Sequence, residues 1–157
     1  MNRRTILSIV ILIACAGVVG FFVMNDRPIT LDPALESYTR HIIAIGDKKI
    51  PVFMADTPQK KAQGLGNFTG IPREDGMLFT FSKPEAIDIW MKDMLFPIDV
   101  LWFDENAKLV HIVERMRPDS FPQRFFSEVP ALFVLEVNAG FIKKSKIKMG
   151  DAFQFIE

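Results

Sequence analysis

The stretch GMLFTFSKPEAIDIWMKDMLFPIDVLWFD, from Gly76 to Asp104, decides the fold of this chain. It contains three short apolar runs, Met77–Phe81, Ile87–Met91 and Ile98–Phe103, with a proline in each of the two segments between them. Apolar runs of this length, bounded by proline and polar residues and rich in aromatic side chains, are typical of β-strands. We therefore expect three adjacent strands at the centre of the domain.

The preceding segment predicts two further strands and one helix. Two apolar runs on either side of a polar turn predict a hairpin over 40–55. Thr57 suits the N-cap of a helix and Pro58 its first position. Gly64 or Gly66 suits its C-terminal end. We expect a short, solvent-facing helix after the hairpin.

The C-terminal part continues the pattern of short strands. We expect a second hairpin over 98–113, an interior strand over 131–137, a short helical turn over 139–144 and a last strand over 152–156. The segment 115–130 contains three prolines and no periodicity, which is typical of an irregular loop. The sequence therefore predicts a mainly β fold, a small sandwich or barrel with one or two short helices.

The N-terminal segment Thr5–Met24 is apolar and carries no charge over twenty residues. A helix of that length is about 30 Å long, which is the thickness of the apolar core of a bilayer. Two arginines precede the segment, and basic residues favour the cytoplasmic side. We expect residues 1–25 to be a single-pass anchor in the cell membrane, 26–38 to be a linker, and 39–157 to form one domain outside the cytoplasm.

Two alternatives remain open for this segment. A cleaved secretory signal usually has a shorter apolar region of about 7–15 residues and a small-residue cleavage site. This segment shows no such site before Asn25. A lipoprotein signal would carry its lipid on Cys15, because Leu12-Ile13-Ala14-Cys15 resembles a lipobox. An uncleaved anchor and a lipid on Cys15 both predict a membrane-tethered protein.

The composition argues against several classes of function. The chain has 19 basic and 19 acidic residues, so no charge excess favours a nucleic-acid partner. Its single cysteine is Cys15, so the domain has no disulfide, thiol nucleophile or thiolate metal site. Two histidines without metal-ligand spacing, and the lack of phosphate-binding or nucleophile motifs, predict no metal and no cofactor.

Several sequence blocks occur in an order that is typical of one family. They are VFMADTPQKKAQGL, DGMLFTF, IWMKDMLFPIDVLWFD, PALFVLEVNAGF and KMGD. Over about 40–157, the chain resembles the bacterial and archaeal family named domain of unknown function 192. The resemblance implies a mostly β, jelly-roll-like domain, often behind a signal or anchor, with no established activity.

The chain departs from the pattern of that family at two places. The family usually reads W-M-K-N-T where this chain has Asp93 and Met94 after Trp-Met-Lys. It also often has Met and Arg after its Gly-Leu pair, where this chain has Gly66 and Phe68. If the polar cluster of the family includes those side chains, this chain lacks part of it.

Asp99 is the first candidate site residue, because it lies inside an apolar strand. An unpaired buried carboxylate is strongly disfavoured, so we expect a partner, either Lys92 across the turn at Pro97 or backbone amides. In the structural interpretation this pairing only stabilises the turn. In the functional interpretation Lys92 and Asp99 line a pocket that has Trp90 as its floor and binds an anionic or sugar-like ligand.

Glu136 is a second carboxyl inside an apolar strand. In the structural interpretation it faces solvent or a loop amide. In the functional interpretation it joins Asp99 as a second carboxylate. Paired carboxylates can act as general acid and base when their pKa values differ, which leaves a hydrolase acting on envelope polysaccharide as an alternative.

Together, these patterns favour a binding module over an enzyme. The candidate ligand-binding residues are Trp90, Lys92, Asp99 and Glu136, and no residue is assigned a catalytic role. We expect the partner to be a small ligand or an envelope protein, with a structural accessory of a membrane complex as a third possibility. We also expect Trp90 to pack in the core, so that its loss would destabilise the domain.

Overall fold

The computed structural model describes residues 31–156 of the chain. Within this range, no helix is long and apolar enough to cross a membrane. The expected anchor Thr5–Met24 and the lipidation candidate Cys15 lie outside the described residues. Both therefore stay predictions from the sequence.

The described residues form nine strands, two short α-helices and two short 3-10 helices. In chain order they are η1 (Pro33–Ser37), β1 (Arg40–Ile45), β2 (Lys48–Ala55), α2 (Pro58–Gln63), β3 (Gly76–Glu85), β4 (Asp88–Trp90), β5 (Ile98–Phe103), β6 (Leu109–Met116), η2 (Pro118–Ser120), β7 (Arg124–Phe126), β8 (Ala131–Asn138), α3 (Phe141–Ser145) and β9 (Phe153–Phe155). The mainly β prediction is confirmed, and so are the hairpins predicted over 40–55 and 98–113.

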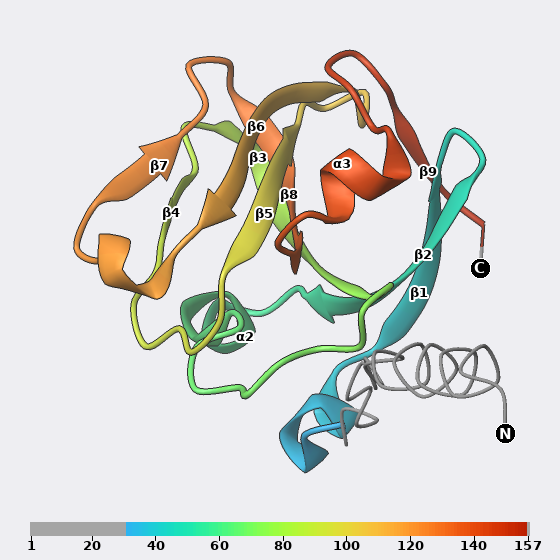
Figure 1. Cartoon of the computed structure of the whole chain (residues 1–157). Coiled ribbons are helices and arrows are strands. Elements are labelled where there is room, and N and C mark those ends of the chain that lie inside the picture. The colour runs from blue at the N-terminus through green and yellow to red at the C-terminus, as the bar shows by residue number, and fades with distance from the viewer. Residues whose placement is uncertain (1–30, 157) are drawn as a thin grey trace, which may run out of the picture.

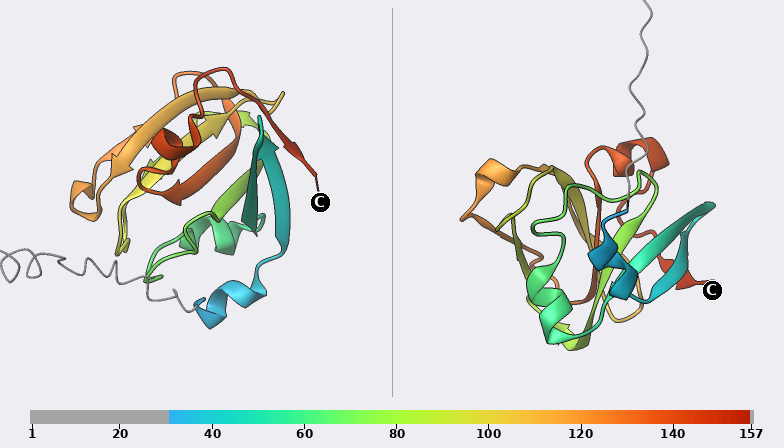
Figure 2. Two further views of the ribbon diagram at one scale, coloured as in Figure 1. Left: turned by 45° about the vertical axis from the view of Figure 1, so that its right-hand side comes forward. Right: turned by 90° about the horizontal axis from the view of Figure 1, so that it is seen from below.

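Seven of the strands form one mixed sheet, in the order β6-β5-β8-β3-β2-β1-β9. The sheet curls into a half-barrel, and its curvature is clearest in the left view of Figure 2. The remaining strands, β4 and β7, pair with each other as a separate antiparallel ribbon. In Figure 1 this ribbon lies at one side of the molecule, above α2.

The expectation of three adjacent central strands is wrong. Strand β8 lies between β5 and β3 and pairs antiparallel with both, and β4 belongs to the other sheet. The segment 115–130 is also more regular than expected, because it contains η2 and β7. Strand order depends on contacts between distant segments, so the local apolar pattern could not predict it.

The sheet is buried on both faces at β5. Every residue of β5 is buried, and alternate side chains enter two different apolar clusters. Val100 and Trp102 pack in the first cluster, whereas Leu101 and Phe103 pack in the second. A strand that is covered on both sides is expected to be a continuous apolar run, as this one is. Asp99 is the one charged residue in this apolar run, and it is fully buried as well.

The helix α2 has the ends that the sequence predicts. The side-chain oxygen of Thr57 accepts a hydrogen bond from the backbone N–H of Lys60 at 3.2 Å, and Pro58 occupies the first turn. Gly64 ends the helix with a φ of 52°, in a region that glycine adopts without steric cost. Because Gly64 is buried, this helix end lies against the sheet instead of in solvent.

Candidate functional site

Asp99 is held by backbone amides and not by Lys92. Its Oδ1 accepts a hydrogen bond from the N–H of Arg115 at 2.9 Å. Its Oδ2 accepts hydrogen bonds from the N–H groups of Gly140 at 2.9 Å and Ile142 at 3.1 Å, at the start of α3. Of the two partners that the sequence left open, the structure selects the backbone amides.

The position of Asp99 explains why the carboxylate is needed. Between the pairs Ile98–Met116 and Val100–Val113, one residue of β5 faces two residues of β6, which is a β-bulge. Arg115 lies in this bulge with a φ of 56°. The carboxylate therefore joins the bulged strand to the N-terminus of α3 and satisfies three buried or partly buried amide groups.

The carboxyl of Glu136, unlike that of Asp99, is not fully hydrogen-bonded within the protein. It is only 5% exposed, and its Oε2 atom is buried without a hydrogen-bond partner. Its register partners on the neighbouring strands are Met77 of β3 and Val100 of β5, which offer no polar side chain. Burial raises the pKa of the Glu136 carboxyl to about 8. The carboxyl is therefore mainly protonated at neutral pH.

Asp99 and Glu136 lie on opposite faces of the sheet. Asp99 pairs with Val137, and Glu136 pairs with Val100, so the two carboxyls differ by one position in a pattern that alternates at every residue. They cannot act together as a general acid and base. The pair of carboxylates on which a hydrolase interpretation rested does not form.

Glu136 lies in a pocket of about 290 Å³ between α2 and the β4 strand. The pocket is formed by the C-terminal half of α2 and the loop after it, by β4 and the loop after it, and by Phe79 of β3. Trp90 and Lys92 also line it. Three of the four sequence-predicted binding residues therefore meet in one pocket, and Asp99 does not reach it.

Trp90 lies at the rim of the pocket and not in the core. It is 37% exposed, whereas Trp102 is fully buried and donates a hydrogen bond from Nε1 to the backbone oxygen of Ile87 at 2.9 Å. The guanidinium carbon of Arg124 lies 4.1 Å from the centre of the Trp90 ring system, and the Phe121 ring lies at 5.6 Å. Trp90 is thus held in place by a cation–π contact while part of it faces the pocket.

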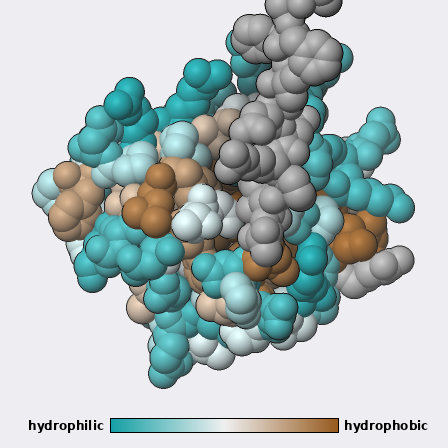
Figure 3. Space-filling view, turned by 60° about the horizontal axis from the view of Figure 1, so that its bottom comes forward, coloured by the Kyte–Doolittle hydropathy of each residue, from teal (hydrophilic) through white to brown (hydrophobic). Residues whose placement is uncertain are grey.

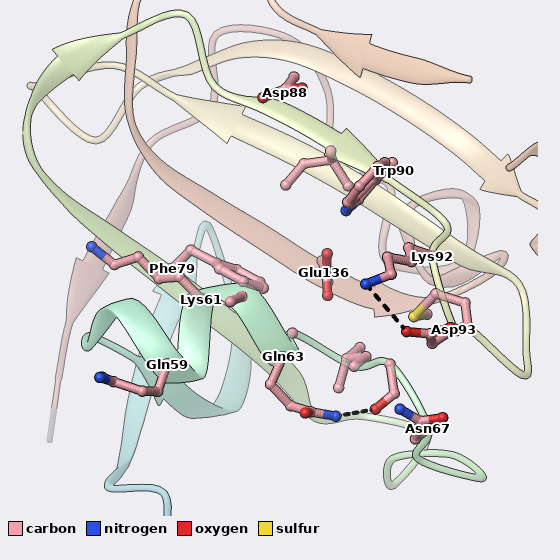
Figure 4. Close-up of a pocket in the computed structure, with 16 residues that line it drawn as sticks. Gln59, Lys61, Gln63, Asn67, Phe79, Asp88, Trp90, Lys92, Asp93 and Glu136 are labelled. Atoms are coloured by element: carbon pink, nitrogen blue, oxygen red, sulfur yellow. Dashed lines mark hydrogen bonds and ion pairs between the residues drawn. The ribbon is translucent and has the colours of Figure 1, made fainter. Parts of the chain in front are cut away.

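Lys92 pairs with its sequence neighbour. Its Nζ atom lies 3.7 Å from Oδ2 of Asp93, and both side chains are about half exposed. An exposed pair of this kind contributes about 0–1 kcal/mol to stability. In Figure 4 the amine of Lys92 and the indole nitrogen of Trp90 are both directed toward Glu136. The expected pair of Lys92 with Asp99 does not form.

A direct backbone contact joins the two loops that line the pocket. The N–H of Asn67 donates to the backbone oxygen of Asp93 at 2.7 Å. Both residues have positive φ values, 63° and 59°, a conformation that Asn and Asp tolerate better than most residues. This contact fixes the distance between the α2 side and the β4 side of the pocket.

The sequence interpretation missed the whole α2 side of the pocket. Gln59, Lys61, Gln63 and Asn67 belong to it, because α2 borders the pocket. The helix is solvent-facing, as predicted, since none of its residues is buried. One signal was present in the sequence. Three of the four positions where the chain departs from the pattern it resembles, Gly66, Asp93 and Met94, line this pocket, whereas Phe68 does not.

The acidic residues and the histidines of the described part of the chain form no metal site. Within residues 31–156, no group of three or more His, Cys, Asp or Glu side chains could hold a metal ion. His111 packs against the Trp102 ring at 5.1 Å, and His41 packs against Phe155 at 5.7 Å. Figure 3 shows the α2 side of the molecule, where apolar residues appear as separate groups among hydrophilic ones.

Comparisons with known proteins agree with this fold. A crystal structure of a proposed transcription regulator from Sinorhizobium meliloti 1021 matches with a TM-score of 0.71 and 27% sequence identity, covering 76% of this chain and 95% of that chain. A crystal structure of a protein of unknown function from Novosphingobium aromaticivorans DSM 12444 matches with a TM-score of 0.67 and 22% identity, covering 80% and 99%.

At the level of sequence, no functionally curated protein matches the chain significantly. The family model of domain of unknown function 192, described as "Uncharacterized ACR", matches residues 41–155. This range includes every residue of the pocket between α2 and β4. The chain belongs to the domain of unknown function 192 family.

Proposed function

We propose that this chain is a binding module that holds a small ligand in the pocket between α2 and β4. One observation carries the proposal: Glu136 is buried at this pocket, and the protein offers its Oε2 atom no hydrogen-bond partner. Nearly all buried polar groups in native proteins are hydrogen-bonded, so each exception needs a reason. Asp99 shows that this fold can satisfy a buried carboxyl fully, with three amide donors.

The loss of stability that comes from burying Glu136 supports a functional role for this residue. A buried carboxyl without a partner destabilises a folded protein, and an apolar residue at the same position would not. Departures from good packing that nothing in the fold compensates are expected at functional sites. A ligand that hydrogen-bonds to the Glu136 carboxyl would give this group a polar contact that the protein itself does not supply.

The rest of the pocket suits a small ligand. Its volume of about 290 Å³ is just below the range of about 300–1,000 Å³ that is typical of ligand sites. Its lining combines an aromatic platform, Trp90, with amide groups such as Gln59 and Asn67. A few polar groups around an apolar surface are what small-molecule sites usually offer.

The sequence supports a location for this module. In this proposal residues 1–25 tether the chain to the cell membrane, 26–38 form a linker, and 39–157 form a jelly-roll-like binding domain outside the cytoplasm. The support is the uncharged segment Thr5–Met24, which has the length of a membrane span, and the two arginines before it. A lipid on Cys15 would tether the domain to the same membrane.

The two tryptophans make a direct test possible. The full-length chain, labelled with nitrogen-15 in a detergent without a sugar headgroup, has one indole N–H signal from Trp90 and one from Trp102. Trp90 lines the pocket, whereas Trp102 is buried and bonded to Ile87, so Trp102 serves as an internal control. A Trp90→Phe variant assigns the two signals.

The test is a screen of neutral sugars, sugar acids, amino sugars, amino acids and inorganic anions. We expect at least one class to shift the Trp90 signal in a saturable way and to leave the Trp102 signal in place. The same compound should raise the melting temperature of the wild type, because a ligand that binds only the folded state stabilises it. If no class shifts the Trp90 signal, the pocket is not a small-ligand site and the proposed function is wrong.

A further inference from the structure

The pocket offers a ligand no net charge, and this restricts the class of ligand. The charged residues that line the pocket together with Glu136 are Lys61 from α2, Asp88 from β4, and Lys92 and Asp93 from the loop after β4. The neighbours of Glu136 on β3 and β5 are apolar. With Glu136 protonated, two positive and two negative groups surround the pocket.

Three of these four charges form ion pairs within the protein, and the fourth, Lys61, lies over an aromatic ring. Asp88 pairs with Arg124, and Lys92 pairs with Asp93 at 3.7 Å. The Nζ atom of Lys61 lies 4.6 Å from the centre of the Phe81 ring. A charged ligand would have to compete with these contacts and would meet charges of its own sign at the rim. Burying an unbalanced charge in such a site is costly.

From this arrangement we infer that the ligand is a neutral, hydroxyl-bearing ring of the sugar class, hydrogen-bonded to Glu136 beside Trp90. This inference rests on the proposed function and names the ligand class of that same pocket. A pocket of about 290 Å³ holds one ring more readily than an extended chain. Hydroxyl groups can both donate and accept hydrogen bonds, as the amides of Gln59 and Asn67 and the Glu136 carboxyl require.

The protonation state of Glu136 supports the same ligand class. Burial raises the pKa of Glu136 to about 8, so at neutral pH its carboxyl can donate one hydrogen bond as well as accept others. A neutral ligand that covers the carboxyl excludes the remaining water and further disfavours the ionised form. Binding of a neutral ring should therefore require the protonated carboxyl.

The alternative is a cationic ligand that forms an ion pair with ionised Glu136. Three probes that share one ring separate the possibilities: glucose is neutral, glucosamine is cationic and glucuronate is anionic at about pH 6.5. Binding is measured on the full-length chain through the indole signals of Trp90 and Trp102, in a detergent without a sugar headgroup. We expect glucose to shift the Trp90 signal with at least tenfold higher affinity than either charged probe. A short linear glucose oligomer is added to distinguish a free sugar from the end of a polysaccharide, since both present the same ring.

The pH dependence gives a second readout. Glucose affinity should fall about tenfold for each pH unit above about 8, because only the protonated carboxyl binds. In Glu136→Gln, which keeps a neutral hydrogen-bonding group, the affinity should no longer depend on pH in this range. In Glu136→Leu, which keeps the size but not the hydrogen bonds, the Trp90 signal should not respond to glucose. Thermal melting of both variants checks that they are folded.

Each other outcome overturns the inference. If glucosamine binds best and Glu136→Gln abolishes its binding, the ligand is cationic and the pocket still binds ligands, so the proposed function stands. If glucuronate binds best, the ligand is anionic, with the same consequence. If none of the three probes shifts the Trp90 signal, the sugar class is wrong, and the broader screen then decides the proposed function separately.

Discussion

Replacing Glu136 by Gln should change how the stability of this protein depends on pH. The pKa of Glu136 is 4.5 in the unfolded chain and about 8 in the folded one, because burial without a partner disfavours the charged form. Between these two values the folded state binds more protons than the unfolded state. The free energy of unfolding therefore falls as the pH rises through this window and is not affected by Glu136 below it.

The size of the effect follows from the two pKa values. A change from 4.5 to about 8 corresponds to about 5 kcal/mol across the whole window, at about 1.4 kcal/mol for each pKa unit. A glutamine at this position stays neutral at every pH, so the variant lacks this loss. We expect the wild type and Glu136→Gln to differ by less than about 1 kcal/mol near pH 4.5, and the variant to be about 3–5 kcal/mol more stable near pH 8.5.

Urea unfolding of the full-length chain at several pH values measures this difference. The contributions of other carboxyls, such as Asp75, whose pKa burial also raises, cancel when the two proteins are compared. Glu85→Gln is the matched control, because it makes the same substitution at an exposed position at the end of β3. Its stability should run parallel to that of the wild type. If the free energy of unfolding of Glu136→Gln also runs parallel to that of the wild type between about pH 5 and 8.5, the carboxyl is ionised in the folded protein. Our account of the pocket would then be wrong.

Three further substitutions test the fold around the pocket. Asp99→Ala should lower the free energy of unfolding by about 3–5 kcal/mol in urea, because three buried or partly buried amide groups lose their acceptor; a loss below about 1 kcal/mol would contradict this role. Trp102→Ala should cost about 3–5 kcal/mol, whereas Trp90→Ala should cost less than about 2 kcal/mol, since only the first is fully buried; equal losses would contradict the assignment of Trp90 to the rim. Gly76→Ala should lower the melting temperature, by an amount equivalent to about 1–3 kcal/mol. The added Cβ would lie 2.9 Å from the backbone oxygen of Glu136, and an unchanged melting temperature would show that β3 and β8 can separate without cost.

Local signals in the sequence predicted the elements well. The alternation of apolar and polar residues, turn residues and helix caps each involve only a few neighbouring residues. They can therefore be recognised from the sequence alone. The hairpins over 40–55 and 98–113 and the ends of α2 at Thr57 and Gly64 follow from such signals. The rule that a buried carboxylate needs a partner also held for Asp99, whose oxygens accept three amide hydrogen bonds.

Only the tertiary structure determined which side chains contact one another. The sequence placed Lys92 near Asp99 because they are close along the chain, yet the partners of Asp99 come from β6 and from the start of α3. The two tryptophans could not be ranked by burial either. Trp90 lies on the small ribbon with β7, and Trp102 lies on β5, an interior strand of the large sheet that is buried on both sides.

The pocket itself is the clearest case. The sequence alone determined that Glu136 lies in an apolar strand, but it left open whether the carboxyl faces solvent or lines a site. It did not determine which face of the sheet Glu136 occupies or that α2 lies over that face, because both depend on the insertion of β8 between β5 and β3. Strand order is set by contacts between segments that are far apart in the chain, and these contacts bring α2, β4 and Glu136 to one pocket while they leave Asp99 on the other side of the sheet.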